Sequence, residues 1–197
     1  MTIDSCGVPQ LLEPDLRSLK YLIDNISCPK IIEIGCWSGY GTIHLASWAK
    51  EKGGHVWSID TFDGNGSELK NSSYDPYKAL AGNLLTFGLQ DTVTVIKGRS
   101  DDVLDKIPDD CNMVFIDADH RYKQVLRDID NYSAKVKKGF VTGHDFNGWE
   151  WDEKHINEDC VEGNNGFKYH HGVSKAVTQR FPHVNRLFVS VWWHLKE

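Results

Sequence analysis

Short apolar runs alternate with amphipathic segments along most of the chain, and this alternation constrains the fold more than any other feature. Strands are predicted over residues 31–35, 55–60, 92–96, 113–116 and 140–145. Apolar residues at helical spacing predict helices over residues 14–26, 41–52, 77–87, 102–107, 122–136 and 173–181. Because each helix must carry the chain back across the sheet, we expect a doubly wound, mostly parallel α/β sheet with helices on both faces.

The two ends of the chain and one long loop complete this organisation. We expect the first helix to cap the sheet edge and one further strand around residues 187–193 after the last helix. The 197 residues are enough for one hydrophobic core, so residues 1–197 are interpreted as one domain. Residues 146–172 form a long polar and aromatic insertion loop, and loops of this length are usually functional or mobile. Its aromatic and histidine residues are Trp149, Trp151, His155, Phe167, Tyr169, His170 and His171.

Composition excludes several classes of function. The formal net charge is −6, and no lysine or arginine cluster is long enough to follow a phosphate backbone, so we expect no nucleic-acid partner. No apolar stretch approaches the roughly 18 residues of a membrane span and no signal peptide is visible, so we expect a cytoplasmic protein without membrane contact. The five cysteines are scattered and lack a CxxC pair, which indicates reduced thiols.

The most specific motif is a glycine-rich turn after the first predicted strand. Residues 33–41, EIGCWSGYG, have the form E-x-G-x-x-x-G-x-G. Glycines at Gly35 and Gly39 let the backbone turn sharply and approach a ligand closely. Asp60 ends the second predicted strand, where a carboxylate can accept hydrogen bonds from both hydroxyls of a ribose. A plain connection between strand and helix remains the alternative for the turn alone.

From about residue 31 to residue 145, these features resemble class I S-adenosylmethionine-dependent methyltransferases, which have a Rossmann-like fold. The resemblance implies that Gly35 and Gly39 shape the methionine pocket, that Glu33 helps to hold the amino-acid end and that Asp60 binds the ribose. It also implies that Ser100 and Asp101 lie beside the adenine, although either residue could instead cap a helix. The dinucleotide pattern G-x-G-x-x-G is not matched in register, which disfavours a nicotinamide cofactor.

Two later segments, FIDADHRY at residues 115–122 and GFVTGHDF at residues 139–146, are similar to metal-dependent O-methyltransferases. The stretch DTFDG at residues 60–64 looks like the sugar-modifying, macrocin-type branch of that group. The resemblance implies a divalent ion, Mg²⁺ or Mn²⁺, held by Asp117, His144 and Asp145. His144 departs from the branch, whose members carry an acid there. The alternative is that Asp117 and Asp145 cap helices or bind the cofactor without a metal ion.

His120 follows Asp117 by three residues, where related enzymes keep a catalytic histidine or lysine. A neutral imidazole there could accept the proton of an acceptor hydroxyl, with Asp117 beside it, although a cap or a solvent contact is the simpler interpretation of its position. The expected activity is O-methylation of a small hydroxylated, sugar-like metabolite. Two alternatives stay open: a nicotinamide-dependent oxidoreductase, and a non-catalytic cofactor-binding or interaction protein. The aromatic residues of loop 146–172 could close over an acceptor, or pack on the domain or on a partner subunit of a homo-oligomer.

Overall fold

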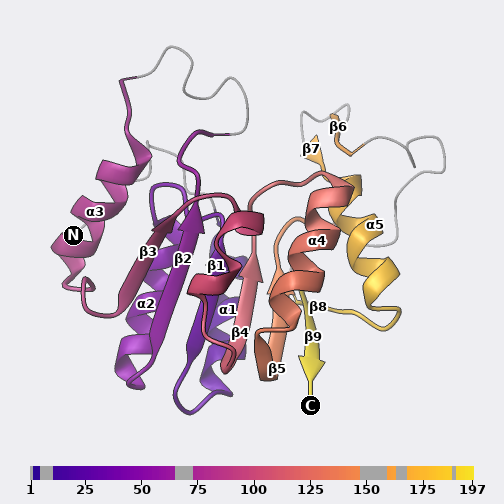
Figure 1. The fold of residues 1–197 in the computed structure, drawn as a ribbon, viewed down its shortest axis with the longest axis horizontal. Helices are drawn as coiled ribbons and strands as arrows, with labels where there is room; N and C mark the ends of the chain where they lie inside the picture. The colour runs from indigo at the N-terminus through magenta and orange to yellow at the C-terminus, as the bar shows by residue number, and fades with distance from the viewer. Residues whose placement is uncertain (1, 5–10, 65–72, 147–158, 163–167, 188–189) are drawn as a thin grey trace.

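The structure is a computed structural model that describes residues 2–4, 11–64, 73–146, 159–162, 168–187 and 190–197. In these residues, seven strands form one central sheet, and two short strands pair separately (Figure 1). The strands of the central sheet are β1 (Lys30–Ile34), β2 (His55–Asp60), β3 (Val93–Lys97), β4 (Cys111–Ile116), β5 (Val136–Gly143), β8 (Asn185–Leu187) and β9 (Val191–Lys196). The separate hairpin, formed by β6 (Val161–Glu162) and β7 (Lys168–Tyr169), lies within the predicted insertion loop.

The strand order is β3-β2-β1-β4-β5-β9-β8. The first five strands in this order run parallel, and β9 and β8 are antiparallel to their neighbours. β1 lies in the middle with β2 and β4 on its two sides, so the direction of winding reverses at β1. This arrangement confirms the predicted doubly wound, mostly parallel sheet, and ligands of such sheets bind beyond the carboxyl ends of the strands near the reversal.

Helices cover both faces of the sheet, as predicted (Figure 1). The helices are α1 (Glu13–Asp24), α2 (Tyr40–Glu51), α3 (Pro76–Phe87), α4 (Tyr122–Ser133) and α5 (His171–Arg180), with the short 3₁₀ helices η1 (Ser100–Asp102) and η2 (Leu104–Lys106). Side chains of α1, α2 and α3 pack in one buried apolar cluster, and those of α4 and α5 pack in a second. Residues 31–34 of β1 are buried one after another because both faces of the sheet are covered.

Three details of the sequence interpretation are wrong. The first helix covers a face of the sheet instead of its edge, since Leu19 and Leu22 of α1 belong to the same buried cluster as Met113 of β4. Val136 begins β5 and does not continue the preceding helix, because α4 ends at Ser133. The tail contains two antiparallel strands, not one. Strand β8 has the sequence NRL and is mostly exposed at the sheet edge, so it carries no apolar pattern by which the sequence could have identified it as a strand.

Candidate functional site

Backbone hydrogen bonds join the carboxyl ends of the central strands into one edge. The amide of Gly35 donates to Ile59 at 2.8 Å, and the amide of Asp117 donates to Ile34 at 2.8 Å. At the next pair of strands, the amide of His144 donates to the carbonyl of Ile116 at 3.1 Å. The ends of β1, β2, β4 and β5 therefore lie side by side, and the residues that follow them share one edge of the sheet.

The glycine-rich turn has the backbone that its sequence predicts. Gly35, Trp37 and Gly39 all have positive φ values, 93°, 44° and 89°. A Cβ on Gly35 would lie 2.6 Å from the carbonyl carbon of Asp117 and 2.8 Å from the Cα of Ala118. Gly39 is the residue before the first turn of α2. The chain thus passes from β1 into α2 through a left-handed turn that packs closely against the end of β4. A side chain at position 35 would displace the backbone there, so this position requires glycine.

Asp60 binds this turn directly. Its carboxylate accepts a hydrogen bond from the amide of Trp37 at 2.7 Å and another from the amide of Phe62 at 2.7 Å. Burial raises the pKa of Asp60, and the backbone donors act against this rise. Backbone amides thus occupy part of the acceptor capacity of this carboxylate, and the predicted contact of Asp60 with a ribose stays a prediction.

Glu33 lies beneath the turn and is 1% exposed. One oxygen of its carboxylate accepts hydrogen bonds from Thr42 of α2 and Ser58 of β2, both at 2.7 Å. Burial raises the pKa of Glu33 to about 7, against the lowering effect of the two hydroxyl donors. In the structure Glu33 therefore links α2 to the sheet, and its predicted contact with the amino-acid end of a cofactor stays a prediction.

Ser100 and Asp101 follow β3, whose end is joined to β2 by a bond from the amide of Gly98 to the carbonyl of Asp60 at 2.9 Å. The Ser100 hydroxyl donates to Asp128 of α4 at 2.6 Å, and the Tyr132 hydroxyl donates to the Ser100 carbonyl at 2.7 Å. Helix α4 thus holds η1 near Asp60. The Ser100 side chain faces α4, a role that the sequence did not suggest, and an adenine contact at Ser100 or Asp101 stays a prediction.

The three predicted metal ligands come together at the ends of β4 and β5. One ligand atom from each of Asp117, His144 and Asp145 lies within 4.8 Å of the other two. Nδ1 of His144 is 3.3 Å from Oδ1 of Asp145 and 3.8 Å from Oδ1 of Asp117. Asp145 has a φ of 58°, an unusual backbone conformation for a residue with a side chain, and such strain is concentrated at functional sites.

His120 borders the same cluster. Its Nε2 lies 2.8 Å from Oδ2 of Asp145 and 3.6 Å from Oδ1 of Asp117. The ring also contacts the ring of His170 in a tilted arrangement, with 4.1 Å between ring centroids. His120, Asp145 and His170 form a second group of candidate ligands. His170 lies in the predicted insertion loop, where the sequence indicated only an aromatic and histidine-rich segment. His120 thus lies beside Asp117 and Asp145, and its predicted role as a proton acceptor stays a prediction.

The charges in this cluster are strongly coupled. Burial lowers the pKa of His120, but Asp117 and Asp145 outweigh it and raise the pKa to about 10. Burial likewise lowers the pKa of His144, and the carboxylates of Asp117, Asp145 and Asp15 outweigh it, so the pKa rises to about 11. For Asp145 burial raises the pKa, while the two histidines lower it well below its usual range. As the structure stands, two imidazolium rings and their carboxylates form one ion-paired cluster.

Two residues of this cluster were missed by the sequence interpretation. Asp15 of α1 is 1% exposed, and its Oδ2 lies 3.3 Å from Nε2 of His144. The Ser190 hydroxyl lies 2.8 Å from the same nitrogen and donates to Asp15 at 3.2 Å. Asp15 is the third residue of α1 and accepts a bond from the amide of Leu12, so its sequence position indicates only a helix cap. No local sequence pattern could have predicted that Asp15 contacts His144, which follows β5.

Other predicted features lie beside the site or outside the described residues. Trp149, Trp151, His155 and Phe167 belong to the parts of the loop that the structure does not describe. Tyr122 of α4 is partly buried and packs against the second apolar cluster. Cys36 is buried, which raises its thiol pKa well above the usual value and supports packing as its role.

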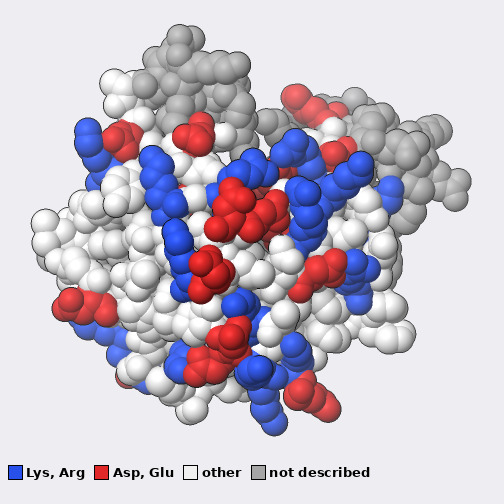
Figure 2. Space-filling view, in the orientation of Figure 1, with Lys and Arg blue, Asp and Glu red and all other residues white. Residues whose placement is uncertain are grey.

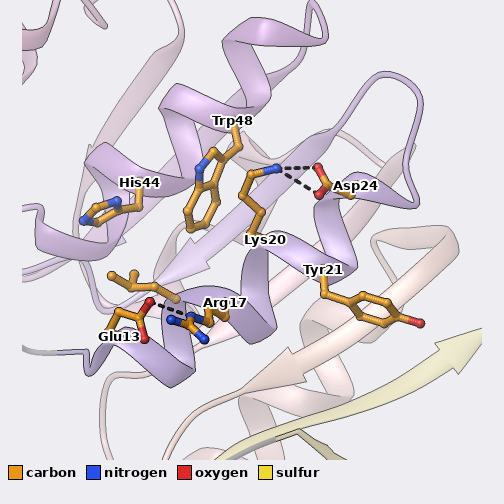
Figure 3. A pocket seen from close by; sticks show the side chains of 8 residues that line it. Glu13, Arg17, Lys20, Tyr21, Asp24, His44 and Trp48 are labelled. Carbon is orange, nitrogen blue, oxygen red and sulfur yellow. Dashed lines mark hydrogen bonds and ion pairs between the residues drawn. The ribbon is translucent and has the colours of Figure 1, made fainter.

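A groove of about 410 Å³ lies elsewhere, between α1 and α2 (Figure 3). Its lining residues are Glu13, Leu16, Arg17, Lys20, Tyr21, Asp24, His44 and Trp48. The charged residues of α1 pair with each other along the helix, Arg17 with Glu13 at 2.5 Å and Lys20 with Asp24 at 2.8 Å. None of the predicted site residues lines this groove, so it is separate from the cluster at the strand ends.

The doubly wound sheet, the left-handed glycine turn and the acid after β2 define a Rossmann-like domain of the methyltransferase class. The family model described as "Methyltransferase domain" matches residues 32–146, and the chain belongs to this family. This confirms the family and the class I methyltransferase fold that the resemblance implied. Most of β1, strands β2 to β5, the glycine turn, Asp60 and Asp117 fall within the matched segment, whereas Asp15 and Ser190 lie outside it.

Solved structures agree on the fold. A Staphylococcus aureus protein provisionally assigned as a caffeoyl-CoA O-methyltransferase superposes with a TM-score of 0.70 at 20% identity, over 96% of this chain and 86% of that one. An O-methyltransferase from Bacillus cereus in complex with SAH gives 0.64 at 18% identity, over 96% and 84%. TomG, an O-methyltransferase of tomaymycin synthesis from Streptomyces achromogenes in complex with SAM, gives 0.64 at 16%, over 95% and 81%. No curated protein matches the sequence.

Proposed function

We propose that this protein transfers the methyl group of S-adenosylmethionine to a hydroxyl oxygen of a small hydroxylated, sugar-like metabolite. The observation that carries the proposal is the left-handed turn from Gly35 to Gly39, fastened to Asp60 through the amide of Trp37. Together with membership of the methyltransferase family, this cradle at the carboxyl ends of β1 and β2 favours an adenosyl ligand. Solved neighbours described as O-methyltransferases, two of them with SAM or SAH, support the donor and the oxygen acceptor.

The cofactor would lie across the strand ends. Asp60 would accept from the ribose hydroxyls, the backbone of Gly35 and Gly39 would line the methionine end above Glu33, and Ser100 and Asp101 would lie near the adenine. Asp117, directly after β4, would lie between donor and acceptor. The main contribution of the protein would be alignment, because methyl transfer is an in-line displacement that depends on holding the two reactants in contact.

The acceptor would lie beside Asp117 and His120. As the bond from carbon to the acceptor oxygen forms and the bond from sulfur to carbon breaks, the hydroxyl proton would pass to Nε2 of a neutral His120. Without a metal ion, Asp117 and Asp145 hold the His120 ring protonated. A cation held by these carboxylates would offset their charge and lower the pKa of His120, which would free Nε2 to accept. Asp117, His144 and Asp145 offer three ligand atoms close enough to share one divalent cation. Such an ion, if bound, would hold the acceptor oxygen and lower the pKa of its hydroxyl.

The distribution of charge on the surface agrees with a small acceptor. On the face shown in Figure 2, lysine and arginine side chains are interspersed with aspartate and glutamate and do not form a continuous basic stripe. No helix in the described part of the chain combines the length and the apolar character needed to cross a membrane.

Calorimetry with S-adenosylhomocysteine and, separately, with NAD(H) tests the donor. We expect S-adenosylhomocysteine to bind and Asp60→Ala to weaken its binding about 10- to 150-fold, since hydrogen bonds to a charged acceptor contribute roughly 1.5–3 kcal/mol. Asp63→Ala, on the same loop and exposed, is the matched control and should bind as the wild type does. Binding of NAD(H) alone would instead identify an oxidoreductase.

Transfer of labelled methyl groups to a panel of sugars, catechols and other hydroxylated metabolites tests the chemistry. His120→Gln should lower kcat by about 10²- to 10⁴-fold, which is the usual contribution of a general base. The affinity for S-adenosylhomocysteine should stay unchanged. Tight S-adenosylhomocysteine binding without transfer to any acceptor would favour a non-catalytic protein. Equal rates for wild type and His120→Gln would remove His120 from the mechanism.

A further inference from the structure

His144 stands where the resemblance expects an acid, and the structure shows what the imidazole contacts on each side. Its Nε2 faces away from the cluster, toward Ser190 at 2.8 Å and Asp15 at 3.3 Å. Its Nδ1 faces Asp145 and Asp117 at 3.3 and 3.8 Å. The side chain is 12% exposed and Asp15 is 1% exposed, so packing and buried partners hold the ring in this orientation.

The hydrogen bonds that link Nε2 of His144, Ser190 and Asp15 have one consistent direction. An ionised carboxylate can only accept, so Ser190 must donate its hydroxyl proton to Asp15. The Ser190 oxygen then accepts from His144, which places a proton on Nε2. In the neutral ring, the lone pair therefore lies on Nδ1, between Asp117 and Asp145. A carboxylate behind the outer nitrogen of a histidine is the usual way in which proteins orient a histidine ligand toward a metal ion.

The spacing of the inner atoms suits a small cation. Metal ligand bonds of about 2.0–2.2 Å place neighbouring ligand atoms roughly 3.0–3.5 Å apart in octahedral or tetrahedral geometry. The distances from Nδ1 to the two aspartates, 3.3 and 3.8 Å, need only small adjustments to match. The donor set is one imidazole nitrogen and two carboxylates, whereas Mg²⁺ prefers oxygen ligands and retains several waters. Imidazole nitrogen favours zinc and the later transition metals.

We propose that Asp117, His144 and Asp145 form a mixed nitrogen and oxygen centre that selects a divalent transition metal of the Zn²⁺ and Co²⁺ type over Mg²⁺, with Asp15 and Ser190 as positioning residues. The expectation of Mg²⁺ or Mn²⁺ from the resemblance assumed hard oxygen ligands, and His144 changes that set. The inference rests on the proposed function only for the place of the ion beside the acceptor. N-terminal helix α1, outside the matched family segment, thereby becomes part of the metal site.

Metal binding to the full chain, freed of metal with a chelator, tests this without methyl donor or acceptor. Calorimetry should show one Zn²⁺ per chain bound at least about 10²-fold more tightly than Mg²⁺, and Co²⁺ should give the visible absorption bands of nitrogen ligation. His144→Asp supplies three carboxylates and should lower the ratio of Zn²⁺ to Mg²⁺ affinity at least about tenfold and remove the nitrogen signature. His55→Asp, a histidine at the start of β2, is the control for binding at surface histidines and should leave the ratio unchanged.

The positioning residues have their own readout. Asp15→Asn should weaken Zn²⁺ binding about 10- to 100-fold at unchanged stoichiometry, which is the usual effect of losing a group that orients a metal ligand. Ser190→Ala, which leaves the cap of α1 intact, gives a second measurement if Asp15→Asn folds poorly. If His144→Asp left the ratio of Zn²⁺ to Mg²⁺ affinity unchanged, the proposal would be overturned. Unchanged Zn²⁺ affinity in both Asp15→Asn and Ser190→Ala would refute the positioning roles.

The outcomes separate this inference from the proposed function. S-adenosylhomocysteine binding with no specific Zn²⁺ site would refute only the metal centre. A specific Zn²⁺ site in a protein that binds no S-adenosylhomocysteine would refute only the methyltransferase proposal.

Discussion

Replacing Gly35 with alanine tests the feature on which the cofactor site depends, and Gly88 provides a matched control. Both glycines have positive φ, 93° at Gly35 and 63° at Gly88. At Gly88, which ends α3, an added Cβ would meet nothing within 4 Å, so Gly88→Ala should cost only the left-handed conformation, about 1–2 kcal/mol. At Gly35 the Cβ would overlap the backbone of Asp117 and Ala118. Overpacking of this kind adds about 1–3 kcal/mol, so Gly35→Ala should lose about 2–5 kcal/mol in total.

The backbone at Asp117 cannot yield easily, because its amide is hydrogen-bonded to Ile34 at 2.8 Å. Relief of the overlap would therefore move the glycine turn itself, and a displacement of about 1 Å in a binding site can cost up to about 10²-fold in function. Urea denaturation of both variants gives the free energies of unfolding, and calorimetry gives their affinities for S-adenosylhomocysteine. A loss in Gly35→Ala no greater than that in Gly88→Ala, with cofactor affinity retained, would refute the argument that close approach of turn and strand shapes the site.

Three further predictions concern stability. The pKa of Glu33 is raised from 4.5 to about 7, so the unfolded chain loses this proton first as pH rises, and stability falls between about pH 4.5 and 7. Glu33→Gln should remove this fall, which amounts to about 2 kcal/mol between pH 5 and 7.5, as urea titrations of variant and wild type at both pH values would show. Tyr132→Phe should cost about 1–2 kcal/mol because the buried Ser100 carbonyl loses its donor, and a loss near zero in denaturation would contradict a structural role for this bond. Arg180→Ala breaks a surface pair with Asp130 and should cost no more than about 1 kcal/mol, so a larger change in thermal unfolding would show a role beyond the pair.

The features that the sequence predicted correctly are local. Hydrophobic periodicity identifies strands and helices because each element buries a face that repeats along a few residues. The positions of Gly35, Asp60 and Asp117 follow from the ends of those elements, and parallel strands bring such ends to one edge. The same reasoning failed at the tail, because β8 is a short, mostly exposed edge strand with the sequence NRL and buries no repeating apolar face.

By itself, the sequence determined the family, the doubly wound sheet and the edge at which the glycine turn and the acidic residues gather. Only the tertiary structure decided which groups complete that site. Asp15 accepts a hydrogen bond from Ser190, which is 175 residues away in the chain, and both residues contact His144. The physical reason is that periodicity and turn chemistry act over a few neighbouring residues. Contacts between α1, the loop after β5 and the start of β9 exist only once helices and strands have packed, and no short pattern encodes them.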